Sequence, residues 1–133
     1  MLTSLEIDKM PCHPILIVED EPDLRETLGE LLELEGFGVA MAANGQEALQ
    51  YLREIGQSCL ILLDLMMPVM NGWQFLEALR EMRPHMVAAI PVVVISAAAD
   101  VTDVQQQYGC LVMKKPVNLK QLIALAHEHC EIG

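Results

Sequence analysis

Five polar side chains each follow a short apolar run, and their types suit the binding of a cation and the transfer of a phosphoryl group. They are two carboxylates after the first run, a third carboxylate, a hydroxyl and an ammonium after later runs: Glu19, Asp20, Asp64, Ser96 and Lys115. In an open α/β sheet, ligands bind beyond the carboxyl ends of the strands. If the runs are parallel strands, all five groups meet at one edge of the sheet.

The charges of this set point to a particular chemistry. Three carboxylates at one edge repel one another, and the single ammonium of Lys115 cannot balance them. Mg²⁺ suits such a site because it prefers oxygen ligands and keeps several waters. A carboxylate such as Asp64, beside a cation and a lysine, is a plausible nucleophile toward phosphorus. Lys115 and the hydroxyl of Ser96 could then bind the phosphoryl oxygens.

Short apolar runs alternate with helical patterns along the chain, which indicates repeated βα units and a parallel sheet. The expected strands span residues 15–18, 37–42, 59–63, 92–95 and 111–113. The first and third runs are continuously apolar, as expected for strands covered on both faces. Asp64 directly follows the third run, where an unpaired carboxylate would be costly.

Helical periodicity and end signals predict the elements between the strands. Pro22 starts one helix and Gly36 ends it, while Asn44 and Asn118 are N-caps, and a short helix falls within 100–108. Three of the longer helices are expected to place one face inward, formed by Leu24, Leu28, Leu31 and Leu32; by Ala48, Leu49, Leu52 and Ile55; and by Leu119, Leu122, Ile123 and Ala126. Trp73, Leu76, Leu79 and Arg80 mark the remaining one. Together these elements predict a (βα)₅ fold, which is a doubly wound, parallel five-stranded sheet. It is expected to span residues 14–133 and to follow an N-terminal extension of residues 1–13.

The charge and composition of the chain disfavour some classes of binding partner. The chain has 133 residues, with 19 acidic and 8 basic side chains and a net charge of −11. Such a surface repels nucleic-acid phosphates and anionic membranes, so neither is an expected partner. No apolar run approaches the roughly 20 residues of a membrane span, and the N-terminus lacks a secretory pattern. We therefore expect a cytoplasmic protein.

The cysteines and histidines carry no strong metal pattern. None of the four cysteines forms a C-x-x-C pair, and reduced thiols are the expectation. His127, His129 and Cys130 invite a zinc hypothesis, with Cys12 and His13 as further ligands, but their spacing matches no zinc motif. An exposed helix end explains the two histidines better.

Four segments of the sequence resemble the signature blocks of response-regulator receiver domains. They are LIVEDEP at 16–22, LDLMMPVMNG at 63–72, PVVVISA at 91–97 and Lys115-Pro116, in the family's order and at its spacing. The resemblance covers nearly the whole chain and is closest to single-domain, chemotaxis-type receivers. It implies a flavodoxin-like fold with strand order 2-1-3-4-5. It also implies a signalling phosphoacceptor of two-component systems, not an enzyme acting on other substrates.

The resemblance also implies a role for each site residue. Asp64 resembles the phosphoacceptor, and Glu19 and Asp20 resemble the acidic pair that holds Mg²⁺, with Asp20 as the more direct ligand. Asp64 and the backbone carbonyl of Met66 would complete the protein ligands. The implied phosphoryl donor is a sensor histidine kinase or a histidine phosphotransfer protein. The downstream partner is open, and a homodimer formed on phosphorylation is compatible with the family.

The phosphoryl-binding roles come from the two remaining blocks. Ser96 matches the switch hydroxyl of the family, which moves onto the phosphoryl oxygen. Lys115 matches the family's lysine, and the bond from Lys115 to Pro116 is expected to be cis, which is plausible only before proline.

One departure from the family keeps a rival function open. Receivers usually carry Tyr or Phe three residues before the lysine, whereas this chain has Val112. The usual coupling of hydroxyl to aromatic ring is therefore in doubt, and a pseudo-receiver that binds proteins without phosphorylation is the alternative. A small aspartate-nucleophile phosphatase fits less well, because Met66 stands where its second carboxylate should be. A Rossmann nucleotide site fits worse still, because the turn after the first strand lacks glycines.

The sequence predicts a long-lived phosphoryl group. In relatives, polar side chains two residues after the phosphoacceptor and two after the switch hydroxyl can orient the attacking water. Here these positions hold Met66 and Ala98, which cannot do so. We expect slow loss of phosphate from labelled protein after removal of the donor. Loss as fast as in a receiver with polar residues at both positions would contradict this.

Overall fold

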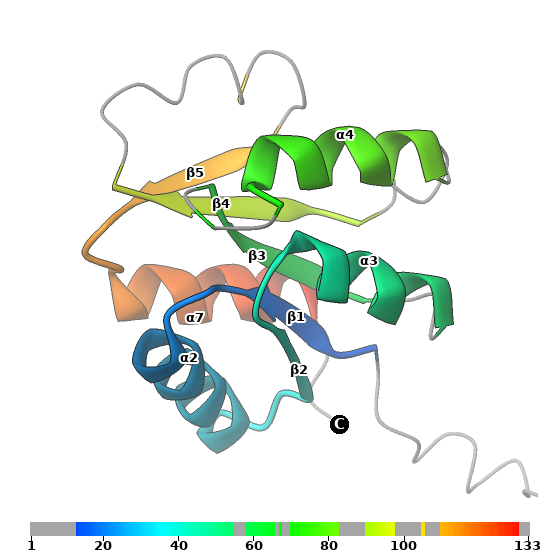
Figure 1. Ribbon diagram of the computed structural model, residues 1–133. Coiled ribbons are helices and arrows are strands. Elements are labelled where there is room, and N and C mark those ends of the chain that lie inside the picture. The colour runs from blue at the N-terminus through cyan, green and yellow to red at the C-terminus, as the bar shows by residue number, and fades with distance from the viewer. Residues whose placement is uncertain are drawn as a thin grey trace, which may run out of the picture.

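A parallel five-stranded sheet organises the chain in the computed structural model (Figure 1), which describes residues 13–54, 58–65, 67, 70–82, 90–97, 105 and 110–130. The strands are β1 (Ile15–Val18), β2 (Val39–Ala42), β3 (Leu60–Asp64), β4 (Val92–Ser96) and β5 (Leu111–Lys114). They lie in the order β2-β1-β3-β4-β5, which confirms the expected topology. The division into an extension and a domain stays a prediction, because residues 1–12 lie outside the described residues.

Helices cover both faces of the sheet. They are α2 (Pro22–Leu34), α3 (Gly45–Glu54), α4 (Gly72–Met82) and α7 (Leu119–His129). Figure 1 shows α3 and α4 on one side of the sheet and α2 and α7 on the other. The expected short helix within 100–108 lies outside the described residues, except for Gln105. No helix in the described part of the chain is long and apolar enough to cross a membrane.

The continuous apolar strands supply the two cores. Successive side chains of a strand point to opposite faces, so a strand buried on both sides must be apolar throughout. Leu63 of β3 belongs to the cluster beneath α3 and α4. Leu62 belongs to the cluster beneath α2 and α7. The side chains of β1 and β4 alternate in the same way, so each of these strands contributes buried residues to both clusters.

The end signals predicted from the sequence are confirmed at three helix termini. Gly36 has a positive φ of 100°, the conformation that lets glycine end α2. The side-chain oxygen of Asn44 accepts a hydrogen bond from the backbone N–H of Glu47 at 2.9 Å. That of Asn118 accepts one from the N–H of Gln121 at 3.1 Å. These bonds satisfy N–H groups that the first helical turns leave unpaired.

Several details of the expected elements are wrong, and one is the third strand, which spans Leu60–Asp64 rather than 59–63. The second strand begins at Val39 rather than at residue 37, because the N–H of Phe37 donates to the carbonyl of Leu32 at 3.1 Å and so still belongs to the end of α2. Leu119 is 43% exposed, whereas Leu125 packs against the core in its place. Leu119 is the first residue of α7, where the helix has only begun to approach the sheet.

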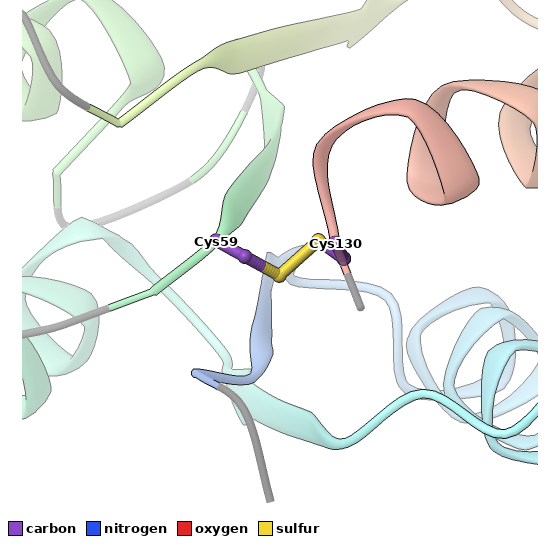
Figure 2. Close-up of a disulfide and its surroundings, with 2 residues drawn as sticks. All are labelled: Cys59 and Cys130. Atoms are coloured by element: carbon purple, nitrogen blue, oxygen red, sulfur yellow. A yellow bond between two sulfur atoms is a disulfide. The ribbon is translucent and has the colours of Figure 1, made fainter. Parts of the chain in front are cut away.

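The expectation of reduced thiols is wrong for two cysteines. Cys59 and Cys130 form a disulfide, although 71 positions separate them (Figure 2). Cys59 directly precedes β3 and Cys130 directly follows α7, so the fold brings their Cα atoms to 5.4 Å. Linear spacing could not show this proximity. Cys110 is free and buried.

Substitution of Gly72 tests the close approach of α4 to β3. A Cβ there would lie 2.7 Å from the Cα of Leu65 and 2.9 Å from the carbonyl oxygen of Asp64. We expect Gly72→Ala to lower the free energy of unfolding by about 2 kcal/mol, because backbone must shift to relieve the overlap. Gly38→Ala is the matched control, since its Cβ would meet nothing closer than 3.8 Å. Equal urea midpoints for the two variants would contradict the expectation.

Candidate functional site

Three carboxylates converge at the carboxyl edge of the sheet, as predicted. Glu19 and Asp20 follow β1, and Asp64 ends β3. One oxygen from each of the three lies within 4.8 Å of the others. The register aligns Val18 with Leu63, so the residues that follow these two positions are adjacent in space. This acidic cluster is the only group of three or more metal-ligating side chains in the part of the chain that the structure describes.

The turn after β1 holds Glu19 in place. Its backbone N–H donates to the carbonyl of Ala42 at 3.1 Å, which extends the pairing with β2 by one residue. Its Oε2 accepts a hydrogen bond from the N–H of Asp20 at 3.1 Å. Glu19 is only 3% exposed, so its carboxyl group points into the fold and meets the other charged groups there.

Arg25 supports this turn, and sequence reasoning missed it. Its Nη1 donates to the backbone carbonyl of Glu19 at 2.8 Å and to that of Asp20 at 3.4 Å. Arg25 lies one turn into α2, close enough to reach back to the end of β1. A basic residue at this distance after an acidic pair was the available signal. Its guanidinium holds the backbone that presents both carboxylates.

Lys115 joins the two sides of the cluster. Its Nζ lies 3.1 Å from Oε1 of Glu19 and 3.5 Å from Oδ2 of Asp64. Burial lowers the pKa of Lys115, but the hydrogen bond to Glu19 and the negative charges of both carboxylates outweigh this, and the pKa is raised above its usual value. Lys115 therefore keeps its positive charge beside Asp64. The Lys115-Pro116 peptide bond is cis, as expected.

Glu19 has the most perturbed carboxyl group of the site. Burial raises its pKa most, and the hydrogen bond and charge of Asp64 add to the effect. The hydrogen bond and charge of Lys115 lower it only in part, so the pKa of Glu19 rises from 4.5 to about 8. The charged form of Glu19 is therefore disfavoured first by burial and second by repulsion from Asp64.

Ser96 lies at the edge where it was predicted. It ends β4, its residue is fully buried, and its backbone carbonyl accepts a hydrogen bond from the N–H of Lys115 at 3.0 Å. In the register of β3 with β4, Asp64 lies beside Ile95. Ser96 is the next residue of β4, so it lies close to the acidic cluster. Met66 and Ala98 lie outside the described residues, and the metal-binding role of the Met66 carbonyl stays a prediction.

Two other sequence interpretations can be placed. Val112 pairs with Val94 in the β4–β5 register and packs, partly buried, against the core beneath α4. A short apolar side chain therefore fills this position of β5. His127 and His129 are exposed at the end of α7, as expected.

Comparison with known proteins assigns the family. Residues 15–127 match the response regulator receiver domain, so the chain belongs to that family. The chain is 43% identical over 117 residues to a protein named transcriptional regulatory protein CpxR homolog from Haemophilus influenzae. That match covers 83% of the chain and 47% of the relative, so the chain spans about half the relative's length.

Solved structures agree with the fold. The chemotaxis protein CheY4 of Vibrio cholerae superposes with a TM-score of 0.76 at 25% identity, covering 88% of this chain and 98% of that one. The response regulator TrrA of Thermotoga maritima, solved in complex with Mg²⁺-BeF, gives a TM-score of 0.73 at 26% identity, covering 87% and 97%. The protein thus has the flavodoxin-like receiver fold of two-component response regulators.

The raised pKa of Glu19 predicts a pH-dependent stability in metal-free buffer. The unfolded chain releases this proton near pH 4.5, whereas the folded chain keeps it to about pH 8. The free energy of unfolding should therefore fall as pH rises through this window. Glu19→Gln should remove that fall. Between about pH 5 and about pH 9 the stability of the variant relative to wild type should therefore rise by on the order of 4 kcal/mol.

Urea unfolding in the presence of a chelator measures this difference. Glu26→Gln is the matched control, because Glu26 is exposed on the neighbouring α2 and its loss should leave the pH profile unchanged. Parallel profiles for wild type and Glu19→Gln would show that Glu19 titrates normally.

Proposed function

We propose that this receiver domain accepts a phosphoryl group on Asp64 in a Mg²⁺-dependent reaction and signals through protein contacts. The observation that carries the proposal is the meeting of Glu19, Asp20 and Asp64 oxygens within 4.8 Å, with the Lys115 ammonium 3.5 Å from Asp64. A buried carboxylate at the end of an apolar strand is costly unless a cation or proton compensates it. The combination suits a charged, reactive aspartate better than a structural one.

The residues present fit a hard divalent cation. The donor set consists of carboxylate oxygens, which Mg²⁺ prefers. Burial, and after it the hydrogen bond and charge of Asp64, raise the pKa of Glu19 to about 8, and a bound cation would oppose this rise. Glu19, Asp20 and Asp64 would hold the ion, with the backbone carbonyl of Met66 as the further ligand expected from the sequence. When bound, Mg²⁺ supplies charge neutralisation for phosphoryl oxygens.

The chain's own groups divide the remaining chemistry between them. An oxygen of Asp64 attacks the phosphorus of a phosphohistidine; the new O–P bond forms as the P–N bond breaks, and the donor imidazole departs. Lys115 is positioned to bind a phosphoryl oxygen and to stabilise the added negative charge. Ser96, at the end of the neighbouring strand, would bind a second oxygen and report the modification.

The partners follow from the family and the charge. The phosphoryl donor would be a sensor histidine kinase or a histidine phosphotransfer protein, and the site of action would be the cytoplasm. The net charge of −11 disfavours direct nucleic-acid contact by this segment, although a relative about twice its length is named as a transcriptional regulator. Dimerisation on phosphorylation is a further possibility of the proposal.

The rival function is a pseudo-receiver that is never phosphorylated. Val112 favours it, because an aliphatic side chain on β5 cannot act as the aromatic reporter of the family. The completeness of the acidic cluster and Lys115 argues for phosphorylation. The two functions differ in one measurable property, which is a covalent adduct on Asp64.

Incubation with Mg²⁺ and acetyl phosphate, followed by intact-mass measurement, tests the proposal. We expect one added phosphoryl group in the wild type, none in Asp64→Asn, and none when a chelator removes the metal. Asp23→Asn is the control, because Asp23 is an exposed carboxylate on α2. If the wild type gains no adduct and binds no Mg²⁺, the pseudo-receiver is the better description. An adduct that persists in Asp64→Asn would place the phosphoacceptor elsewhere.

A further inference from the structure

The Cys59–Cys130 disulfide lies at the edge of the sheet opposite the acidic cluster. Cys59 precedes the first residue of β3, whereas Asp64 is the last residue of that strand. Cys130 follows the last residue of α7. Figure 2 shows the sulfur bridge joining the end of the helix to the start of the strand. The bond therefore fastens the final turn of α7 to the central strand of the sheet.

α7 has a small apolar contact with the rest of the protein. Only Leu122 and Ala126 are fully buried within it, whereas α3 and α4 each bury four residues. In its last turn, His127 is exposed and contributes an edge contact to the ring of Phe37, with centroids 4.9 Å apart. Ala126, the partly buried Leu125 and a contact of 3.9 Å between His127 Nε2 and Glu35 Oε2 also hold this end of the helix. The disulfide is its covalent attachment to the sheet.

Both cysteines have backbone anchors that do not depend on the sulfur bridge. The N–H of Cys59 donates to the carbonyl of Pro14 at 3.1 Å, and the N–H of Cys130 donates to the carbonyl of Ala126 at 2.7 Å. The pairing of β1 with β3 and the cluster beneath α3 and α4 include neither cysteine, whereas the cluster beneath α2 and α7 includes Cys130 and packs against Cys59. Cys59 is partly buried and Cys130 is 6% exposed, so a thiol reagent would approach the bond from the side of Cys59. Opening the bridge should loosen the end of α7 and leave the sheet folded.

We propose that Cys59 and Cys130 are a reversible redox site that controls how firmly the last turn of α7 is held against β3. A reducing dithiol donates two electrons and two protons: one of its thiolates attacks the bridge, its second thiol displaces the protein sulfur, and the dithiol leaves as a disulfide. In reverse, a small disulfide such as oxidised glutathione takes two electrons and two protons from the two thiols and leaves as two thiol molecules.

Cys110 is a natural internal control. It belongs to the cluster on the other face of the sheet, and burial raises the pKa of its thiol to about 11. A thiol that stays protonated is a poor nucleophile for disulfide exchange. Cys110→Ala should therefore leave the behaviour of the pair unchanged, whereas Cys59→Ser and Cys130→Ser should each abolish it.

Glutathione buffers of varied ratio, followed by alkylation and peptide mass mapping, test the proposal. We expect Cys59 and Cys130 to change together from alkylated to bridged as the buffer becomes more oxidising. The reduced protein should keep its far-ultraviolet circular dichroism at 25 °C, with a Tm lower by on the order of 10 °C. Amide hydrogens of residues 126–130 should exchange at least about tenfold faster after reduction, while those of β3 stay protected.

Three outcomes would overturn the proposal. In the first, Cys59 and Cys130 stay reduced in every buffer, so the two thiols do not form a disulfide. In the second, the pair stays bridged in every buffer unless denaturant is added, and the bond is permanent. In the third, reduction unfolds the whole domain, and the disulfide is a structural requirement. None of these readouts uses phosphorylation, so their failure is separate from failure of the phosphoacceptor role.

Discussion

Electrostatic compensation at the carboxyl edge of the sheet is the constraint on which the rest of the site depends. Glu19 and Asp64 are both buried, and two such carboxylates cannot remain charged together without nearby positive charge. Lys115 bridges them, and Arg25 holds the backbone from which Glu19 and Asp20 project. Burial and the charge of Asp64 raise the pKa of Glu19, so the charged form of Glu19 is the least favoured of the cluster. A divalent cation at this edge would favour the charged form again, which is why the proposed function includes one.

The fold meets this constraint through the parallel register of its strands. Because β1, β3, β4 and β5 run in the same direction, residues that are far apart in sequence arrive at one edge. Lys115 and Glu19 are 96 positions apart, yet their side chains form a hydrogen bond of 3.1 Å. The apolar strands and their covering helices set the positions from which these polar groups project.

β3 links the two functional regions that the structure suggests. Its carboxyl end carries Asp64, and its amino end adjoins Cys59. Every residue of the strand is buried between the two apolar clusters. A redox change at one end would act chiefly on α7, whose N-cap Asn118 lies only three residues after Lys115. The two ends can therefore be studied as separate sites on a shared strand.

The sequence by itself determined the strands, the caps at Asn44 and Asn118, the glycine turn at Gly36 and the polar residues that meet at the sheet edge. These are local or periodic properties, since they depend on apolar alternation and on residues a few positions apart. Only the tertiary structure decided the Cys59–Cys130 bond, the reach of Arg25 to the β1 turn, the exposure of Leu119 and the raised pKa of Glu19. Each of these depends on distances and burial set when helices dock on the sheet, and linear spacing does not encode them.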